Sequence, residues 1–199
     1  MHISEGVLTP EILAFGTAVS ALALIYSYRK LSQDDIAIVS ALSALFFIGS
    51  FIHIPVGPVS VHLVLNGLIG AIIGTRAFVA IFVALLLQGL LFGYGGITTL
   101  GINTLNLALP SLVGYWLILP QYNNVLLKQI AYFCVGFIPV ALSAVMLSAT
   151  LALNGEVFIE AAKIAFIAHI PIMIIEGIIA MFTLYFIEKT YPKYLRRGK

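Results

Sequence analysis

The chain has 199 residues, of which 61% are hydrophobic and only 9% are charged, and its formal net charge is +2. Soluble domains carry about 25% charged residues, so this composition excludes an ordinary soluble protein and indicates an integral membrane protein. The single cysteine, Cys134, excludes an intramolecular disulfide and, inside an apolar segment, is interpreted as a small core residue.

Seven apolar segments follow one another along the chain, and most have about the 20 residues that a spanning helix needs. Glycine, proline, asparagine and charged residues separate them. The pattern predicts an all-α integral membrane protein, a seven-transmembrane-helix bundle that forms one domain over residues 1–199. The predicted spans are residues 10–30, 36–54, 60–75, 77–93, 103–120, 129–153 and 163–187.

The basic residues indicate how this bundle is oriented. With the N-terminus outside, all Lys and Arg residues except Lys163 fall on the inner side, as the positive-inside rule requires. We therefore expect an external N-terminus and a cytoplasmic C-terminus. The opening residues lack a basic stretch and a small-residue cleavage site, so we expect no cleaved signal peptide.

The first two residues, Met1 and His2, can form a metal chelate. A free α-amine, the peptide nitrogen that follows it and the Nδ1 atom of His2 can close fused rings on one ion. Three nitrogens in a plane suit Ni(II) and Cu(II), and Co(II) accepts them. We expect Met1 to be retained, because a bulky second residue blocks removal of the initiator methionine.

The four histidines, His2, His53, His62 and His169, all fall at or near the outer side of the predicted bundle. Imidazole is the commonest metal ligand, and ionisable groups within a membrane are candidates for function. Each residue also has a structural interpretation. His62 could instead begin a helix and bond to a loop carbonyl, and His53 could lie at the membrane interface.

Other polar residues are candidates for a supporting role. His169 and Glu176 are seven residues apart, on one helix face and about 10 Å from each other along the axis, too far to share a metal. We expect them to support the bundle interior or to bond polar loop atoms. Asn103 and Asn106 could orient metal ligands or cap the fifth helix.

Two patterns of small residues have structural implications. The glycine-rich run 92–101 lacks the Lys and Ser/Thr of a phosphate-binding loop, and its glycines permit a tight turn with positive φ. Ala37 and Ala41, one helical turn apart, would let another helix approach closely in a membrane.

Four stretches resemble the substrate-binding S component of energy-coupling-factor cobalt/nickel transporters, the CbiM/NikM family. They are residues 1–6, 54–63, 91–103 and 169–177, which together run through nearly the whole chain. The resemblance implies a six-helix S-component core with an extra N-terminal helix. It implies a substrate, Ni2+ or Co2+, bound by the Met1 amine, the amide and imidazole nitrogens of His2, and His62.

The resemblance also implies partners and a location. An S component is a non-enzymatic subunit of a transporter of the ABC type, which binds its ion at the extracytoplasmic face of a prokaryotic cell membrane for ATP-driven uptake. The implied partners are a transmembrane coupling (T) subunit, two cytoplasmic ATPase subunits and a separate small accessory membrane protein. Ala37 and Ala41 match the place where such S components meet the T subunit. A lipid bilayer surrounds the bundle, and no nucleic acid is expected.

Two other functions compete with this interpretation. A stand-alone secondary carrier or channel would use inverted repeats or mid-membrane charges, but no repeat is evident and Glu176 is the only mid-span acid. A membrane metalloenzyme could use His53, His62, His169 and Glu176. It would need an open metal position and a nearby base, and no His-Glu-x-x-His is present. The sequence leaves the choice between Ni2+ and Co2+ open.

Overall fold

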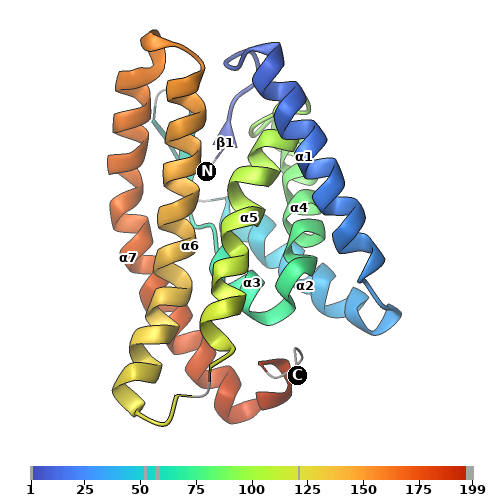
Figure 1. The fold of residues 1–199 in the computed structure, drawn as a ribbon, viewed down its shortest axis with the longest axis vertical. Helices are drawn as coiled ribbons and strands as arrows, with labels where there is room; N and C mark the ends of the chain where they lie inside the picture. Colours follow the sequence, from blue (N-terminus) through green and yellow to red (C-terminus); the bar gives the residue numbers. More distant parts are fainter. Residues whose placement is uncertain (1, 52, 57–58, 121, 196–199) are drawn as a thin grey trace.

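The structure is a computed structural model that describes residues 2–51, 53–56, 59–120 and 122–195. Within these residues the chain forms seven α-helices and a small three-stranded sheet (Figure 1). We call the end where α1, α5 and α7 begin, at the top of Figure 1, the upper end. The helices are α1 Pro10–Arg29, α2 Gln33–Gly49, α3 Asn66–Ile73, α4 Ala77–Phe92, α5 Leu100–Ile118, α6 Val125–Leu153 and α7 Ile159–Thr190. The strands are β1 His2–Ile3, β2 His53–Val56 and β3 Val59–His62.

Helix α1 buries small and polar residues and exposes large apolar ones, the reverse of a helix in a water-soluble protein. Its buried residues are small or polar, Gly16, Ser20 and Ser27, whereas Phe15 and Leu22 are exposed. Small residues let membrane helices approach closely. A Cβ at Gly16 would lie 2.6 Å from the Cβ of Ile102 in α5, so α1 packs almost backbone to backbone against α5.

Four stretches of the described residues are long and apolar enough to cross a membrane, which agrees with a helical membrane protein. They are Pro10–Arg29, Asn66–Phe92, Val125–Leu153 and Glu156–Thr190. Helices α6 and α7 form a long antiparallel pair at one side of the bundle (Figure 1). Seven complete crossings and the placement of the termini on two sides of a membrane stay predictions.

The predicted spanning helix over residues 60–75 is wrong. Residues 59–62 form strand β3, and α3 has only eight residues. Eight helical residues extend about 12 Å, less than half the roughly 30 Å hydrocarbon core. The alternation of valine with polar residues over 59–62 has the period of a strand, and β3 pairs with β2. For the same reason the second predicted helix ends early, at Gly49.

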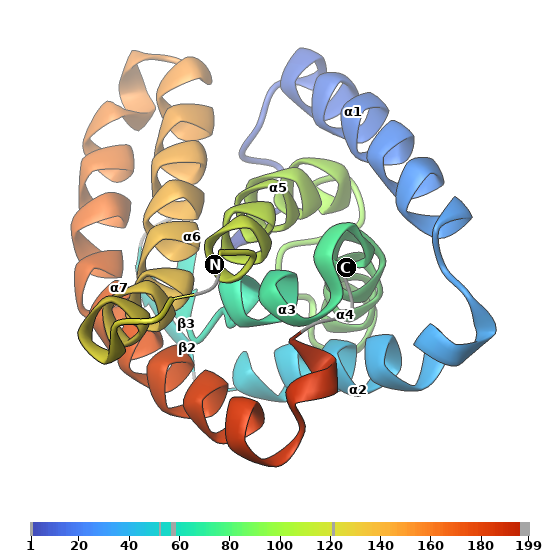
Figure 2. The ribbon, with the colours of Figure 1, turned by 60° about the horizontal axis from the view of Figure 1, so that its bottom comes forward.

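The sheet, which the all-α prediction missed, brings together segments that are far apart in the sequence. Its order is β1-β3-β2 with antiparallel pairing throughout. Residue His2 lies opposite Ser60, and His53 lies opposite His62. Figure 2 shows β2 and β3 beside α7, and α7 contacts both strands. The N-terminal strand is therefore held inside the helical bundle.

The short helix α3 lies below the sheet and is locked against α5 and α6. A Cβ at Gly70 would lie 1.8 Å from the carbonyl oxygen of Ser111, and one at Gly67 would lie 1.9 Å from that of Val135. Only glycine permits such close approach of two backbones. Helix α3 therefore fills the centre of the bundle, as Figure 2 also shows.

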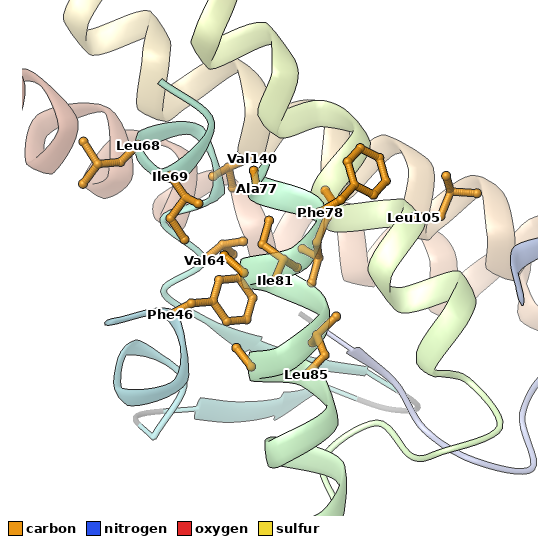
Figure 3. Close-up of a cluster of buried hydrophobic side chains, with 14 of the residues drawn as sticks. Phe46, Val64, Leu68, Ile69, Ala77, Phe78, Ile81, Leu85, Leu105 and Val140 are labelled. Carbon is orange, nitrogen blue, oxygen red and sulfur yellow. The ribbon is translucent and has the colours of Figure 1, made fainter. Parts of the chain in front are cut away.

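The apolar core joins α3 to the neighbouring helices. Figure 3 shows Phe46, Val64 and Ile81 pointing toward one another, with Leu85 below them. Phe46, Val64 and Ile81 are fully buried. Because Val64 follows His62 by two residues, this core anchors the segment that leaves β3.

Candidate metal centre

The sheet brings His2 and His62 together. His62 lies two residues beyond Ser60, the strand partner of His2, and alternate strand residues share a face. The two Nε2 atoms are 2.9 Å apart, and both residues are 2% exposed. The two imidazole rings therefore lie close enough together to serve one ion.

The protonation of His62 suits a ligand. Its Nδ1 atom is 2.6 Å from the carbonyl oxygen of Leu63. Since a carbonyl only accepts, Nδ1–H donates, and the lone pair of the neutral ring lies on Nε2. Metal-binding histidines commonly donate their second ring nitrogen in this way. The ring meets that of Phe46 edge to face, with centroids 6.4 Å apart, so the site has an apolar wall.

The contact with His62 also defines the tautomer of His2. Because Nε2 of His62 accepts, Nε2 of His2 must donate, which leaves the lone pair of the neutral ring on Nδ1. Nδ1 is the nitrogen that the predicted chelate needs. The chelate would require this ring to turn Nδ1 toward the ion, so the direct contact between the histidines belongs to the metal-free chain. Met1, the other predicted ligand, lies outside the described residues.

Asn103 holds the residue that follows His2. Its Oδ1 accepts from the Ile3 N–H at 2.9 Å, and its Nδ2 donates to the Ile3 carbonyl at 3.0 Å. Nδ2 also donates to the Thr99 hydroxyl at 3.1 Å, which fixes the orientation of the amide. Ile3 and Asn103 are buried. The predicted residue Asn103 thus holds the N-terminal strand, and it does so through the backbone of that strand.

The glycine-rich loop between α4 and α5 holds Glu5. The Glu5 N–H donates to the Gly95 carbonyl, and the Glu5 carboxylate accepts from the Thr98 N–H, both at 3.0 Å. A Cβ at Gly96 would lie 1.8 Å from the Cγ of Glu5. The loop therefore binds the N-terminal segment at Glu5. Residue 96 must be glycine because a larger side chain would collide with Glu5.

Glu176 fixes the turn that follows His62. Its carboxylate accepts the backbone N–H groups of Val64 and Leu65, the latter at 2.9 Å to both oxygens. Leu65 has a φ of 54°, the only positive value among the described residues other than glycine. This conformation is costly for leucine. A carboxylate that is 2% exposed thus stabilises a strained turn beside the site.

The structure does not bring His169 and Asn106 into the same cluster. His169 is fully buried on α7, and its Nδ1 donates to the Ala165 carbonyl at 2.6 Å. Nδ2 of Asn106 donates to the Thr150 hydroxyl at 3.4 Å. His53 lies opposite His62 in the sheet, but its side chain is outside the described part of the structure. No group of three His, Cys, Asp or Glu residues close enough to hold a metal occurs among the described residues.

Asn154, in the turn between α6 and α7, was missed in the sequence, where the Asn-Gly pair indicates only a break between helices. Its side chain hydrogen-bonds Val7 and Thr9. Glu5 was also missed as an anchor. Hydrogen bonds between a side chain and a distant backbone leave no pattern in the sequence, so neither role had a signal.

Comparison with known proteins finds similar chains over the whole sequence and over parts of it. A family model described as the cobalt uptake substrate-specific transmembrane region matches residues 2–194. A putative metal transport protein of Haemophilus influenzae is 32% identical over 201 residues, with 99% of this chain and 98% of that protein covered. A fused nickel transport protein, NikMN, of Rhodobacter capsulatus is 36% identical over 114 residues, which cover 54% of this chain and 33% of that protein. The crystal structure of a transition metal transporter has the same fold, with a TM-score of 0.81, 23% identity and 95% and 93% of the two chains covered.

Proposed function

Because the chain belongs to the family of cobalt-uptake substrate-specific transmembrane proteins, we propose that it is the S component of an energy-coupling-factor transporter. As a family member it is a multi-pass prokaryotic membrane protein and a component of metal transport, not an enzyme. In our proposal Met1, His2 and His62 bind the ion to be carried. The substrate is Ni2+ or Co2+, the metals in the names of the family and of a relative.

One observation carries this proposal. The Nε2 atoms of His2 and His62 are 2.9 Å apart, and Nδ1 of His62 is engaged by a backbone carbonyl. The amine and amide nitrogens of the first two residues would complete a four-nitrogen set around the ion. Such a planar set suits Ni(II), and Co(II) accepts it.

The chain would keep the ion at this site until its partners act. Asn103 holds the strand that carries His2, and Glu176 holds the turn after His62. Below the sheet, α3 packs closely against the backbones of α6 and α5 at Gly67 and Gly70. We expect that movement of the ion further inward requires a rearrangement of the protein.

We place the upper end at the extracytoplasmic face. The basic residues Arg29, Lys30, Arg76 and Lys128 lie at or beside the loops of the other end, as the positive-inside rule requires for a cytoplasmic face. The energy would come from two ATPase subunits through a T subunit, with an accessory membrane protein. Ala37 and Ala41 are exposed on α2 and would offer the T subunit a close approach.

The test is a metal titration of the purified chain, carrying any tag at its C-terminus, against a variant with one alanine inserted before Met1. We expect the natural chain to bind Ni2+ or Co2+ and the extended chain to lose binding, because its α-amine is displaced by one residue. The unfolding temperature without metal should be the same for both. Equal affinities would contradict the chelate. Uptake assays with and without the ATPase subunits would distinguish an S component from a stand-alone carrier.

A further inference from the structure

We propose that Asn154, in the turn between α6 and α7, is a positioning residue of the metal centre. Its side-chain amide would fix the outer end of the N-terminal segment, residues 2–9, so that the α-amine and His2 meet His62. This inference rests on the proposed function and assigns a role to a residue that does not itself touch the ion.

Asn154 binds the N-terminal segment through two hydrogen bonds to the backbone. Its Oδ1 accepts from the Thr9 N–H at 2.7 Å, and its Nδ2 donates to the Val7 carbonyl at 2.7 Å. The partners are 145 and 147 residues away in the sequence. The amide therefore ties the turn between the two longest helices to the start of the chain.

Asn103 makes the same arrangement at the inner end of the segment. It donates to and accepts from the backbone of Ile3. Between the two asparagines, Ile3 and Leu8 insert their side chains into the core, with 0% and 8% exposed. The segment is thus attached at both ends, to α5 at Ile3 and to the α6–α7 turn at Val7 and Thr9.

This double attachment matters because a side-chain amide recognises backbone and not sequence. Asn154 and Asn103 fix the path of the segment, whereas Glu5, bound to Thr98, fixes its register. Without the outer attachment, residues 4–9 would sample more conformations in the metal-free chain. Ordering them would then oppose metal binding, since preorganisation strengthens binding by removing such costs. The ion should dissociate faster from such a chain.

The experiment compares Asn154→Ala with Asn124→Ala. Asn124 directly precedes α6 at its other end, and its Oδ1 also accepts two backbone N–H groups, those of Leu126 and Leu127 at 2.8 and 3.3 Å. It is thus a matched asparagine remote from the site. Three quantities are measured: the Kd for Ni2+, the visible absorption of bound Ni2+, and hydrogen exchange of residues 3–9 without metal.

For Asn154→Ala we expect the affinity for Ni2+ to fall about tenfold, as for other residues that orient metal ligands. The absorption of bound Ni2+ should be unchanged, because the ligands are the same, and exchange over residues 3–9 should be faster. Asn124→Ala should match the natural chain in Ni2+ affinity, absorption and hydrogen exchange. If the alanine variant does not fold, Asn154→Asp is measured instead. It keeps the acceptor for Thr9 and loses the donor to Val7, so its affinity should also fall.

The outcomes separate this inference from the proposed function. If the natural chain does not bind Ni2+ or Co2+, the proposed function fails. If it binds and the Asn154 variant binds equally well, only the positioning role is overturned. A changed Ni2+ spectrum would also overturn it, because the ligand set would then depend on Asn154. Faster exchange without weaker binding would show that the attachment does not serve the site.

Discussion

The Nε2 atoms of His2 and His62 lie 2.9 Å apart although 60 residues separate the two histidines in the sequence. The pairing of β1 with β3 creates this contact, and Asn103 holds β1 in place. A strand of only two residues has little stability by itself, since isolated hairpins are already marginal in water. The centre therefore depends on side chains from the helices that hold the first residues of the chain.

The first prediction concerns His62 as a ligand. His62→Ala should weaken Ni2+ binding more than about 100-fold, because loss of a ligand should exceed the 10- to 100-fold cost of losing a residue that only orients one. Cys134→Ala is the control, since this half-buried cysteine takes no part in the site and should leave the affinity unchanged. A titration of each purified variant measures both. A His62→Ala chain that retained its affinity would remove His62 from the ligand set.

The second prediction concerns pH. Ligation requires the amide, the amine and both imidazoles to be free of their protons, so binding releases protons and the affinity falls as the pH falls. The amide alone predicts a fall of about tenfold for each pH unit, because it is protonated in the metal-free chain at all ordinary pH values. Every other ligand that is protonated without metal adds about another factor of ten per unit.

Calorimetry in two buffers with different heats of ionisation counts the protons released. The decisive range is above pH 8, where histidines are ordinarily neutral. The chelate predicts continued proton release there, from the amide. A site made of the two imidazoles alone would release none. Zero release above pH 8 would therefore rule out the amide nitrogen as a ligand while leaving both histidines in place.

The third prediction concerns Gly96. A Cβ there would meet the Cγ of Glu5 at 1.8 Å, and the φ of Gly96 is +142°. Gly96→Ala should displace Glu5 and weaken metal binding. Gly93 is the control for a positive φ without a clash, because its φ is +68° and a Cβ there would meet nothing within 4 Å. Gly93→Ala should therefore have the smaller effect on metal affinity.

A double variant separates the clash from the strain. Adding Glu5→Ala to Gly96→Ala removes the Cγ atom that clashes, so part of the metal affinity should return. Contacting residues are expected to show such non-additive effects. Gly93→Ala and Gly96→Ala could instead lower the metal affinity equally, with no recovery in the double variant. That result would mean that the contact of Glu5 with the glycine-rich loop does not contribute to metal binding.

The sequence predicted the long helices well because hydropathy and breaks identify them directly. Helix α1 ends one residue before the predicted boundary, and α6 ends at the predicted Leu153. The sheet was missed because β1 has two residues and β2 and β3 four each, so that even the alternation over 59–62 is too short to stand out against an apolar background. A run of apolar residues also suits a membrane helix, so residues 60–75 were assigned to one.

The candidate site was also predicted only in part. His2, His62, Asn103 and Glu176 could be selected because polar residues are rare in this apolar chain and therefore conspicuous. Their partners could not be predicted. Asn103 bonds the backbone of Ile3, and Glu176 bonds that of Val64 and Leu65. Backbone groups are the same at every residue, so only the fold determines which of them a side chain meets.

The last prediction concerns Glu176. Its carboxylate accepts from the Val64 and Leu65 N–H groups and supports the left-handed conformation of Leu65. In Glu176→Gln the oxygen Oε2 becomes an NH2 group, which cannot accept and would place a second donor against the buried Leu65 N–H, while the remaining amide oxygen is a weaker acceptor than a carboxylate. We expect the free energy of unfolding to fall by about 1–3 kcal/mol. Because the same turn follows His62, metal affinity should fall as well.

Glu160→Gln is the control on the same helix. Glu160 is exposed, and its Oε1 atom lies 2.7 Å from Nζ of Lys163, three residues along α7. Such surface pairs contribute little, so this variant should unfold at the temperature of the natural chain. Thermal unfolding with and without Ni2+ measures both effects for each variant. If Glu176→Gln and Glu160→Gln behaved alike, the turn after His62 would not need the carboxylate. The strain at Leu65 would then be balanced by the burial of Val64 and Leu65 in the apolar core.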